Sequence, residues 1–440
     1  MQTITSGDKD GSVPELIVEQ QQEHSLLRTF IALRHRNFRL FWFGQMISLI
    51  GTWMQSIGQA WLVLTLTHSA WLLGVVGALQ FLPVMFLSLF GGVLADRLPK
   101  RKVLLFTQSS AMIQAILLWA LVATGHVQIW HVLVLASLLG LTNSIDMPTR
   151  QAFVSEMVGR EDLPNAIALN SSLFNMARVL GPGLGGLIIA WLGVAPLFLL
   201  NAISFIAVIV GLALIDMKSL HGISYLRGKQ LDRPKQNTWQ SLREGLTYVK
   251  RTPAVFLVIA VVGVVSLFGI NFNVMLPLFA TDVLHSGAAG FGFLSAAFGL
   301  GSLFSALWIA WGNNKPSIRF MLLGALAFGV LEILFALSPI YLLSLVLIAS
   351  VGFAQIALSA VANTTIQTIA PNHLRGRVMS VYMMVFAGSV PLGNLFAGGL
   401  AHLYGAPVSL LIGAGLALTA AIVGWIKRAS AEKDLATNLD

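Results

Sequence analysis

The sequence predicts an all-α membrane protein with about twelve transmembrane helices in two pseudo-repeated six-helix bundles. Three observations lead to this fold class: the composition, the succession of long apolar stretches and the distribution of basic residues. Of the 440 residues, 56% are hydrophobic and only 10% are charged, whereas a soluble domain carries roughly 25% charged residues. We therefore expect a lipid bilayer to surround the chain, because no soluble core could bury so much apolar surface.

Apolar stretches of about 20 residues, separated by short polar turns, mark the expected spans. In the first half they cover residues 38–67, 70–95, 103–124, 130–149, 165–192 and 196–216. In the second half they cover residues 254–281, 291–311, 320–337, 341–365, 378–403 and 408–426. The long polar segment between the two groups is the natural boundary between the bundles.

Apart from Arg178, which lies inside a predicted span, the basic residues occur in alternate loops. They lie around positions 28–39, 97–102, 150–160, 218–251, 315–319, 375–377 and 427–428. The intervening loops at 67–70, 124–129, 193–195, 282–290 and 404–407 contain none. This asymmetry is the positive-inside pattern, so we expect both termini in the cytoplasm and the protein in the cytoplasmic (inner) membrane. The net charge of +9 then reflects topology, and no nucleic-acid partner is expected.

These boundaries give five segments. They are a polar cytoplasmic tail at 1–36, an N-terminal six-helix bundle at 37–216, a cytoplasmic linker at 217–252, a C-terminal six-helix bundle at 253–428 and a second tail at 429–440. In the linker, Trp239, Leu242, Leu246 and Val249 follow helical spacing. That spacing predicts an amphipathic helix lying on the membrane surface.

The two halves also repeat one another in sequence. Pro182 corresponds to Pro391, and Gly193 corresponds to Gly405. The displacement is about 210 residues, close to half the chain. Duplicated six-span halves are typical of secondary transporters, in which the substrate site lies between the halves and rocking gives alternating access.

Residues 92–102 read Gly-Val-Leu-Ala-Asp-Arg-Leu-Pro-Lys-Arg-Lys. They resemble the loop signature Gly-x-Leu-x-Asp-Arg-x-Gly-Arg-Arg of the major facilitator superfamily, with Pro99 where that family has Gly. The resemblance implies the major facilitator fold and a gating loop formed by Gly92, Asp96, Arg97 and Arg101. The alternative interpretation is a basic turn that only sets topology.

Residues 181–186 read Gly-Pro-Gly-Leu-Gly-Gly and resemble a motif of antiporters in this superfamily. The resemblance implies a hinge and an export role for Gly181, Pro182, Gly185 and Gly186; plain helix packing by small residues is the alternative. Residues 143–153 and 175–182 are similar to the efflux branch that includes enterobactin exporters.

Charged side chains inside the predicted spans are candidates for a substrate or proton path. Arg178 lies near mid-depth, where it could attract an anionic substrate, tune a proton carrier or bind helix-end carbonyls. Asp146 could carry a proton, but Arg150 is spaced i,i+4 from it, which favours a helical ion pair. Glu332 could carry a proton or could be packed as a neutral acid.

Polar stripes on the spans are further candidates for this path. Gln45, Gln55 and Gln59 lie on one face of the first span, and the other candidates are Asn143, Asn271 and Gln355. Such side chains should point inward, either to a water-filled cavity or to hydrogen bonds between helices. Aromatic residues such as Trp53, Phe81, Phe268 and Phe272 could contact apolar substrate surface.

Sequence patterns for catalysis, cofactors and metals are absent. The chain has no cysteine, its nine histidines form no metal-binding pattern, and it carries neither a phosphate-binding loop nor a nucleophile elbow. We therefore expect neither an enzyme nor a bound cofactor or metal. Any uphill transport should use an ion gradient.

The resulting hypothesis is a secondary transporter that exports a drug-like or siderophore-like small molecule, with protons as the counter-ion and a monomer as the working unit. The first alternative is an uptake symporter of the same fold. An integral membrane enzyme and a transport-inactive scaffold are alternatives from other classes.

Overall fold

The computed structural model describes residues 30–220, 238–311, 317–371 and 373–437, and these ranges are helical with no strand. The first set of helices comprises η1 (Ile31–Arg34), α2 (Arg36–Thr67), α3 (Ala70–Arg97), α4 (Lys100–Ala123), α5 (Ile129–Val158), α6 (Leu163–Leu192), α7 (Ala195–Ala213) and η2 (Met217–Ser219). The second set comprises α9 (Thr238–Arg251), α10 (Pro253–Phe268), α11 (Phe272–Asp282), α12 (Gly287–Trp311), α13 (Ile318–Ala336), α14 (Tyr341–Ile369), α15 (Arg375–Tyr404) and α16 (Ala406–Thr437). The predicted all-α fold class is confirmed.

In the described part of the chain, eleven helical spans are long and apolar enough to cross a membrane, with α10 and α11 counted together. α2 is not among them although it has 32 residues, about 48 Å of helix. Its buried polar side chains, which include Gln45, Gln55 and Gln59, lower its mean hydropathy. α2 packs against α6 and α7 and so completes the expected bundle.

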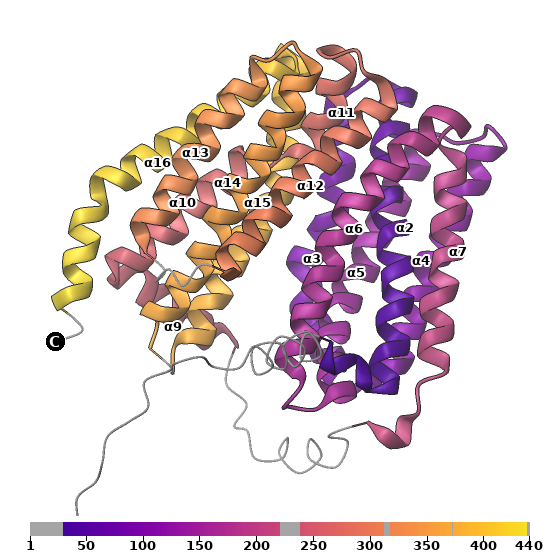
Figure 1. The fold of residues 1–440 in the computed structure, drawn as a ribbon, viewed down its shortest axis with the longest axis horizontal. Coiled ribbons are helices and arrows are strands. Elements are labelled where there is room, and N and C mark those ends of the chain that lie inside the picture. Colours follow the sequence, from indigo (N-terminus) through magenta and orange to yellow (C-terminus); the bar gives the residue numbers. More distant parts are fainter. Residues whose placement is uncertain (1–29, 221–237, 312–316, 372, 438–440) are drawn as a thin grey trace, which may run out of the picture.

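Two helix pairs join the two sets along a seam. α6 packs against α12, and α3 packs against α15. We call the end of the molecule at which η1, α9 and the last turns of α16 lie the basic end. Figure 1 shows the two sets converging at the opposite end and diverging toward the basic end.

Glycines permit the close approach at this seam. A methyl group added to Gly186 of α6 would lie 2.7 Å from the Cα atom of Gly292 in α12. One added to Gly74 of α3 would lie 2.4 Å from the carbonyl oxygen of Asn394 in α15. Both contacts lie away from the basic end, so the seam is closed at the end opposite to it.

The repeat seen in the sequence has a structural counterpart. α6 and α15 are each 30 residues long, and each ends at a glycine with positive φ, 79° at Gly193 and 85° at Gly405. His68 and His285 both have φ of 48°, a backbone conformation that histidine tolerates better than most residues. Each of these histidines precedes a serine, which extends the correspondence to the connections after α2 and α11.

The predicted seventh span is broken into α10 and α11. The N–H groups of Gly269 and Ile270 both donate to the carbonyl of Val265, at 2.8 and 3.2 Å, and the regular ladder ends there. Glycine and asparagine at positions 269 and 271 are weak helix formers. The break places residues 269–271 between α13 and α15.

The amphipathic helix of the linker is present as α9, and part of its apolar face contacts protein, whereas Leu246 of that face is exposed. Val249 is buried, and Leu242 and Tyr248 pack against the main apolar cluster. Glu244 forms an ion pair with Arg377 at the start of α15. α9 is therefore attached to the second set at the basic end.

Candidate functional site

A cavity of about 160 Å³ lies at the seam between the two sets. α2, α3 and α6 of the first set and residues of α11, α12 and the α10–α11 break line it. A drug-sized ligand needs roughly 300 Å³ or more. Because both sets form the walls, separation of the sets would enlarge the cavity.

Polar and aromatic side chains both line this cavity. The polar ones are Ser56, Gln59, Gln80, Arg178, Asn273 and Ser295, and the aromatic ones are Trp53, Phe272, Phe291 and Phe298. Aromatic walls with a few polar groups are typical of small-molecule sites.

Arg178 supplies the positive charge of the cavity. It lies in α6, and its guanidinium carbon is 4.8 Å from the centroid of the Phe298 ring in α12. Among the described residues, no carboxylate lies within ion-pair distance of Arg178. A cation held by an aromatic face in this way can still accept an anionic partner.

Gln59 supplies a second donor. Its side chain is 4% exposed, and its Nε2 atom has no hydrogen-bond partner within the described ranges. A buried amide without a partner costs free energy. Gln59 and Arg178 therefore both suit a ligand that carries hydrogen-bond acceptors.

The other two glutamines of the α2 stripe bind neighbouring helices. Gln45 accepts a hydrogen bond from Arg150 of α5, and Gln55 accepts one from Asn201 of α7 at 2.7 Å. Neither lines the cavity. Within this stripe, Gln59 is the glutamine whose side chain reaches the cavity wall.

Asp146 lies in a polar network inside the first set. It is 2% exposed and forms an ion pair with Arg150. Thr107 and Gln108 of α4 each donate a hydrogen bond to its Oδ1 atom at 2.8 Å. Its carboxylate thus has the helical ion pair considered from the sequence together with two further donors.

The contacts of the signature loop are with the first set. Arg101 donates from Nε to the carbonyl of Leu212 at 2.7 Å, which caps the C-terminus of α7. Arg97 is exposed, and a methyl group added to Gly92 would meet open space. The side chain of Asp96 lies outside those that the structure describes.

The glycine motif of α6 packs against both sets. A methyl group on Gly181 would lie 2.4 Å from the Cβ atom of Trp53, and one on Gly185 would lie 3.4 Å from the Cα atom of Met54. Gly186 contacts α12 as described above, and Pro182 lines the cavity. The motif thus lies where α2, α6 and α12 meet.

Four further predicted candidates do not line the cavity. Asn143 is half-buried in α5, and Gln355 is buried in α14 with an unpaired Oε1 atom. Asn271 and Glu332 lie beside the break between α10 and α11.

Sequence reasoning missed Gln80, Phe291 and Phe298 as cavity residues. A signal existed for Gln80, because it is the one polar side chain between positions 70 and 87. For the phenylalanines, apolar spans offer no comparable contrast.

A model of the transmembrane secretion effector family matches residues 27–438 of this chain. The chain belongs to this family of the major facilitator superfamily.

Three similar proteins are named as transporters. The multidrug efflux pump Tap of Mycolicibacterium fortuitum is 30% identical over 82% of this chain and 88% of its own length. The staphyloferrin A transporter of Staphylococcus aureus is 25% identical, over 83% of this chain and 90% of its own. The enterobactin exporter EntS of Escherichia coli is 27% identical over 86% of each chain.

Solved structures of transporters share the fold of this chain. The nucleoside transporter NupG aligns with a TM-score of 0.70 at 14% identity, over 90% of this chain and 98% of its own. A POT family transporter in complex with a thioalcohol conjugated peptide also gives 0.70 at 14%, over 90% of this chain and 96% of its own. These similarities confirm the major facilitator fold expected from the signature loop.

The comparisons thus confirm the class of protein that the sequence predicted. The protein is a multi-pass membrane transporter of a small molecule and not an enzyme.

Proposed function

We propose that the protein exports a small amphipathic molecule, drug-like or siderophore-like, from the cytoplasm in exchange for protons. Transport occurs by alternating access in the cytoplasmic membrane, with both termini in the cytoplasm. The relatives named as an efflux pump and as an exporter support this direction.

The composition of the cavity is the observation that carries the proposal. Among the described residues, Gln59 Nε2 has no hydrogen-bond partner and Arg178 has no carboxylate within ion-pair distance. Both side chains line the cavity together with Trp53, Phe272 and Phe298. Such a site favours a flat, apolar molecule with an anionic or acceptor group. Because both sets supply the walls, their rocking changes the ligand's access.

The closed part of the seam supports loading from the cytoplasm. Gly74 and Gly186 bring the two sets together away from the basic end, and the positive-inside pattern assigns the basic end to the cytoplasm. Opening of the cavity in this state would therefore be toward the cytoplasm, where an exporter collects its substrate.

A panel of fluorescent anionic and cationic aromatic dyes tests the function. Cells that overproduce the protein should accumulate less of at least one dye than control cells, and an uncoupler should abolish the difference. Greater accumulation would support the uptake symporter instead. A difference that survives uncoupling would refute proton coupling.

The absence of native cysteine makes the topology directly testable. Single cysteines introduced at Lys100 and at His285 should react with a membrane-impermeant maleimide from opposite sides of the membrane. Reaction of both from the same side would refute the proposed orientation and the alternation of loops.

A further inference from the structure

Two unpaired polar atoms lie beside the break between α10 and α11. Asn271 is 2% exposed and Glu332 of α13 is 1% exposed. The Oδ1 atom of Asn271 and the Oε2 atom of Glu332 have no hydrogen-bond partner within the described ranges. A methyl group on Gly269 would lie 3.1 Å from Glu332 Oε2, so this carboxyl group directly contacts the broken segment.

The end of α10 presents backbone carbonyls to these side chains. The last carbonyls of a helix lack intrahelical donors, and the turn at the break closes on Val265. Asn271 already donates from Nδ2 to the carbonyl of Leu267 at 3.0 Å. A protonated carboxyl group could satisfy another carbonyl, whereas a carboxylate has no proton to donate and faces the negative end of the helix dipole.

We propose that Glu332 is a proton-binding site that acts on the α10–α11 break. When protonated, Glu332 donates a hydrogen bond to the carbonyl end of α10 and stabilises the conformation of residues 269–271. When the proton leaves, the carboxylate and the helix-end carbonyls repel each other, and residues 269–271 can move. The role of this site in transport rests on the proposed proton exchange, but proton binding itself does not require transport.

The surroundings favour a proton over a metal cation. The side chains at the break supply only one carboxylate and one amide oxygen. A proton needs a single acceptor, whereas a hard cation would also have to recruit several helix-end carbonyls. α10 carries no titratable side chain, and α14 carries only Tyr341 at its first residue. The described charges of α16 begin at Lys427, in the last third of the helix, and Glu432 there pairs with Arg319 in the first turn of α13. Arg319 is about 20 Å from Glu332 along the helix.

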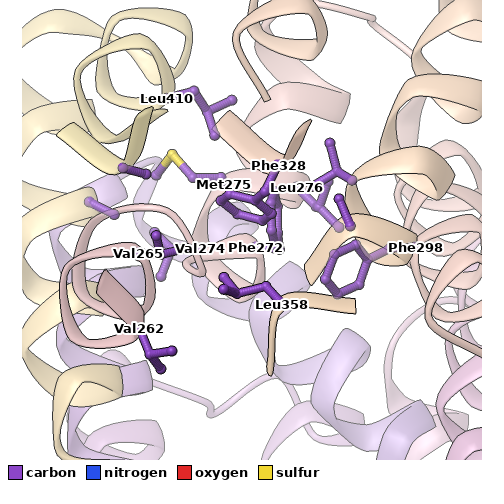
Figure 2. Packing of buried hydrophobic residues seen from close by; sticks show 14 of the residues in the cluster. Val262, Val265, Phe272, Val274, Met275, Leu276, Phe298, Phe328, Leu358 and Leu410 are labelled. Carbon is purple, nitrogen blue, oxygen red and sulfur yellow. The ribbon is translucent and has the colours of Figure 1, made fainter. Parts of the chain in front are cut away.

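Aromatic contacts connect the proton site to the cavity. Phe328 lies one helical turn before Glu332, and its ring centroid is 6.3 Å from that of Phe272. Phe272 in turn lies 4.7 Å from Phe298, the ring beneath Arg178. Figure 2 shows Phe272, Phe298 and Phe328 in one buried cluster. Because Ile270 and Phe272 also line the cavity, movement of the break would change the cavity wall.

Infrared difference spectroscopy tests proton binding without any substrate. The full-length protein in lipid vesicles should show the carbonyl stretch of a buried carboxylic acid when acidic and alkaline buffers are compared. Glu332→Gln should lose this band, Glu332→Asp should shift it, and Asp282→Asn, at an exposed position, should keep it. An unchanged band in Glu332→Gln would overturn the proposal.

Cysteine labelling tests the effect on the cavity wall. Ile270→Cys and Ser56→Cys place thiols on cavity residues of the second and the first set, and their ratio of labelling rates cancels the intrinsic pH dependence of a thiol. The ratio should depend on pH in the native background and lose that dependence with Glu332→Gln. Retained dependence, or a response to sodium at constant pH, would overturn the proposal. Failure of every dye to be transported would refute only the proposed function.

Discussion

The guanidinium group of Arg178 in α6 lies over the ring of Phe298 in α12, with 4.8 Å between the guanidinium carbon and the ring centroid. The contact crosses the seam, since α6 belongs to the first set and α12 to the second. A cation–π contact contributes about 0.5–2 kcal/mol. An anionic ligand could replace or reinforce it, so this pair links ligand binding to the relative position of the sets.

Replacement of Arg178 by alanine should leave membrane insertion intact and reduce transport, because topology depends on the other basic residues. We expect a rise in KM of about tenfold for an anionic substrate, equivalent to about 1.4 kcal/mol of lost interaction. Arg178→Lys should be intermediate. Transport kinetics in vesicles at equal protein amounts measure this. Loss of insertion with an unaltered KM in the remaining protein would show a structural role.

Addition of one methyl group at Gly292 should force the closed part of the seam apart. The methyl group of Gly292→Ala would lie 2.6 Å from both the Cα atom of Gly186 and the carbonyl oxygen of Pro182. Overpacking of this kind costs about 1–3 kcal/mol, so we expect slower transport. A single cysteine at Leu73, a cavity residue, should react faster with an impermeant reagent applied from outside.

The control for this variant is Gly415→Ala in α16, where an added methyl group meets nothing within 4 Å. It should match the native protein in both measurements. Equal labelling of Leu73→Cys in the two glycine variants would show that the seam is not the barrier to access from outside.

Hydropathy and charge predicted the spans because both are read directly along the sequence, without knowledge of how the helices pack. Which polar side chains reach the cavity depends on the rotation of each helix about its own axis. The polar stripe on α2 does not determine that rotation. Gln55 and Gln59 are one turn apart, yet one binds Asn201 and the other lines the cavity. The break at 269–271 contacts α13 and α15, which are distant in sequence. Local propensity alone could suggest the break but not its neighbours.

Replacement of Asp146 by asparagine should destabilise the first set. The carboxylate accepts from Thr107 and Gln108 and pairs with Arg150, so Asp146→Asn weakens three contacts at once. We expect a loss of about 1–3 kcal/mol, seen as a lower unfolding temperature in detergent. The exposed control Glu161→Gln should change little. Unaltered stability together with loss of proton-driven transport would instead support Asp146 as a proton carrier.

The ion pairs at the start of α6 should make stability depend on pH in the acidic range. Asp162 Oδ2 lies 2.6 Å from Nε2 of His35 and 3.0 Å from Arg34. The hydrogen bond with His35, aided by Arg34, holds the pKa of Asp162 below the ordinary value of 3.8. The contacts of Asp162 with His35 and Arg34 therefore stabilise the fold fully above pH 3.8. This stabilisation is lost as the pH falls through the lower pKa that Asp162 has in the folded protein.

Asp162→Asn should accordingly unfold at a lower temperature than the native protein at neutral pH, and the difference should shrink as the buffer becomes strongly acidic. Asp282→Asn, at an exposed position outside this cluster, should show no such convergence. Thermal unfolding of the purified proteins across a pH series measures both. A difference between Asp162→Asn and the native protein that persisted undiminished in strong acid would mean that His35 and Arg34 do not act on Asp162 through its charge.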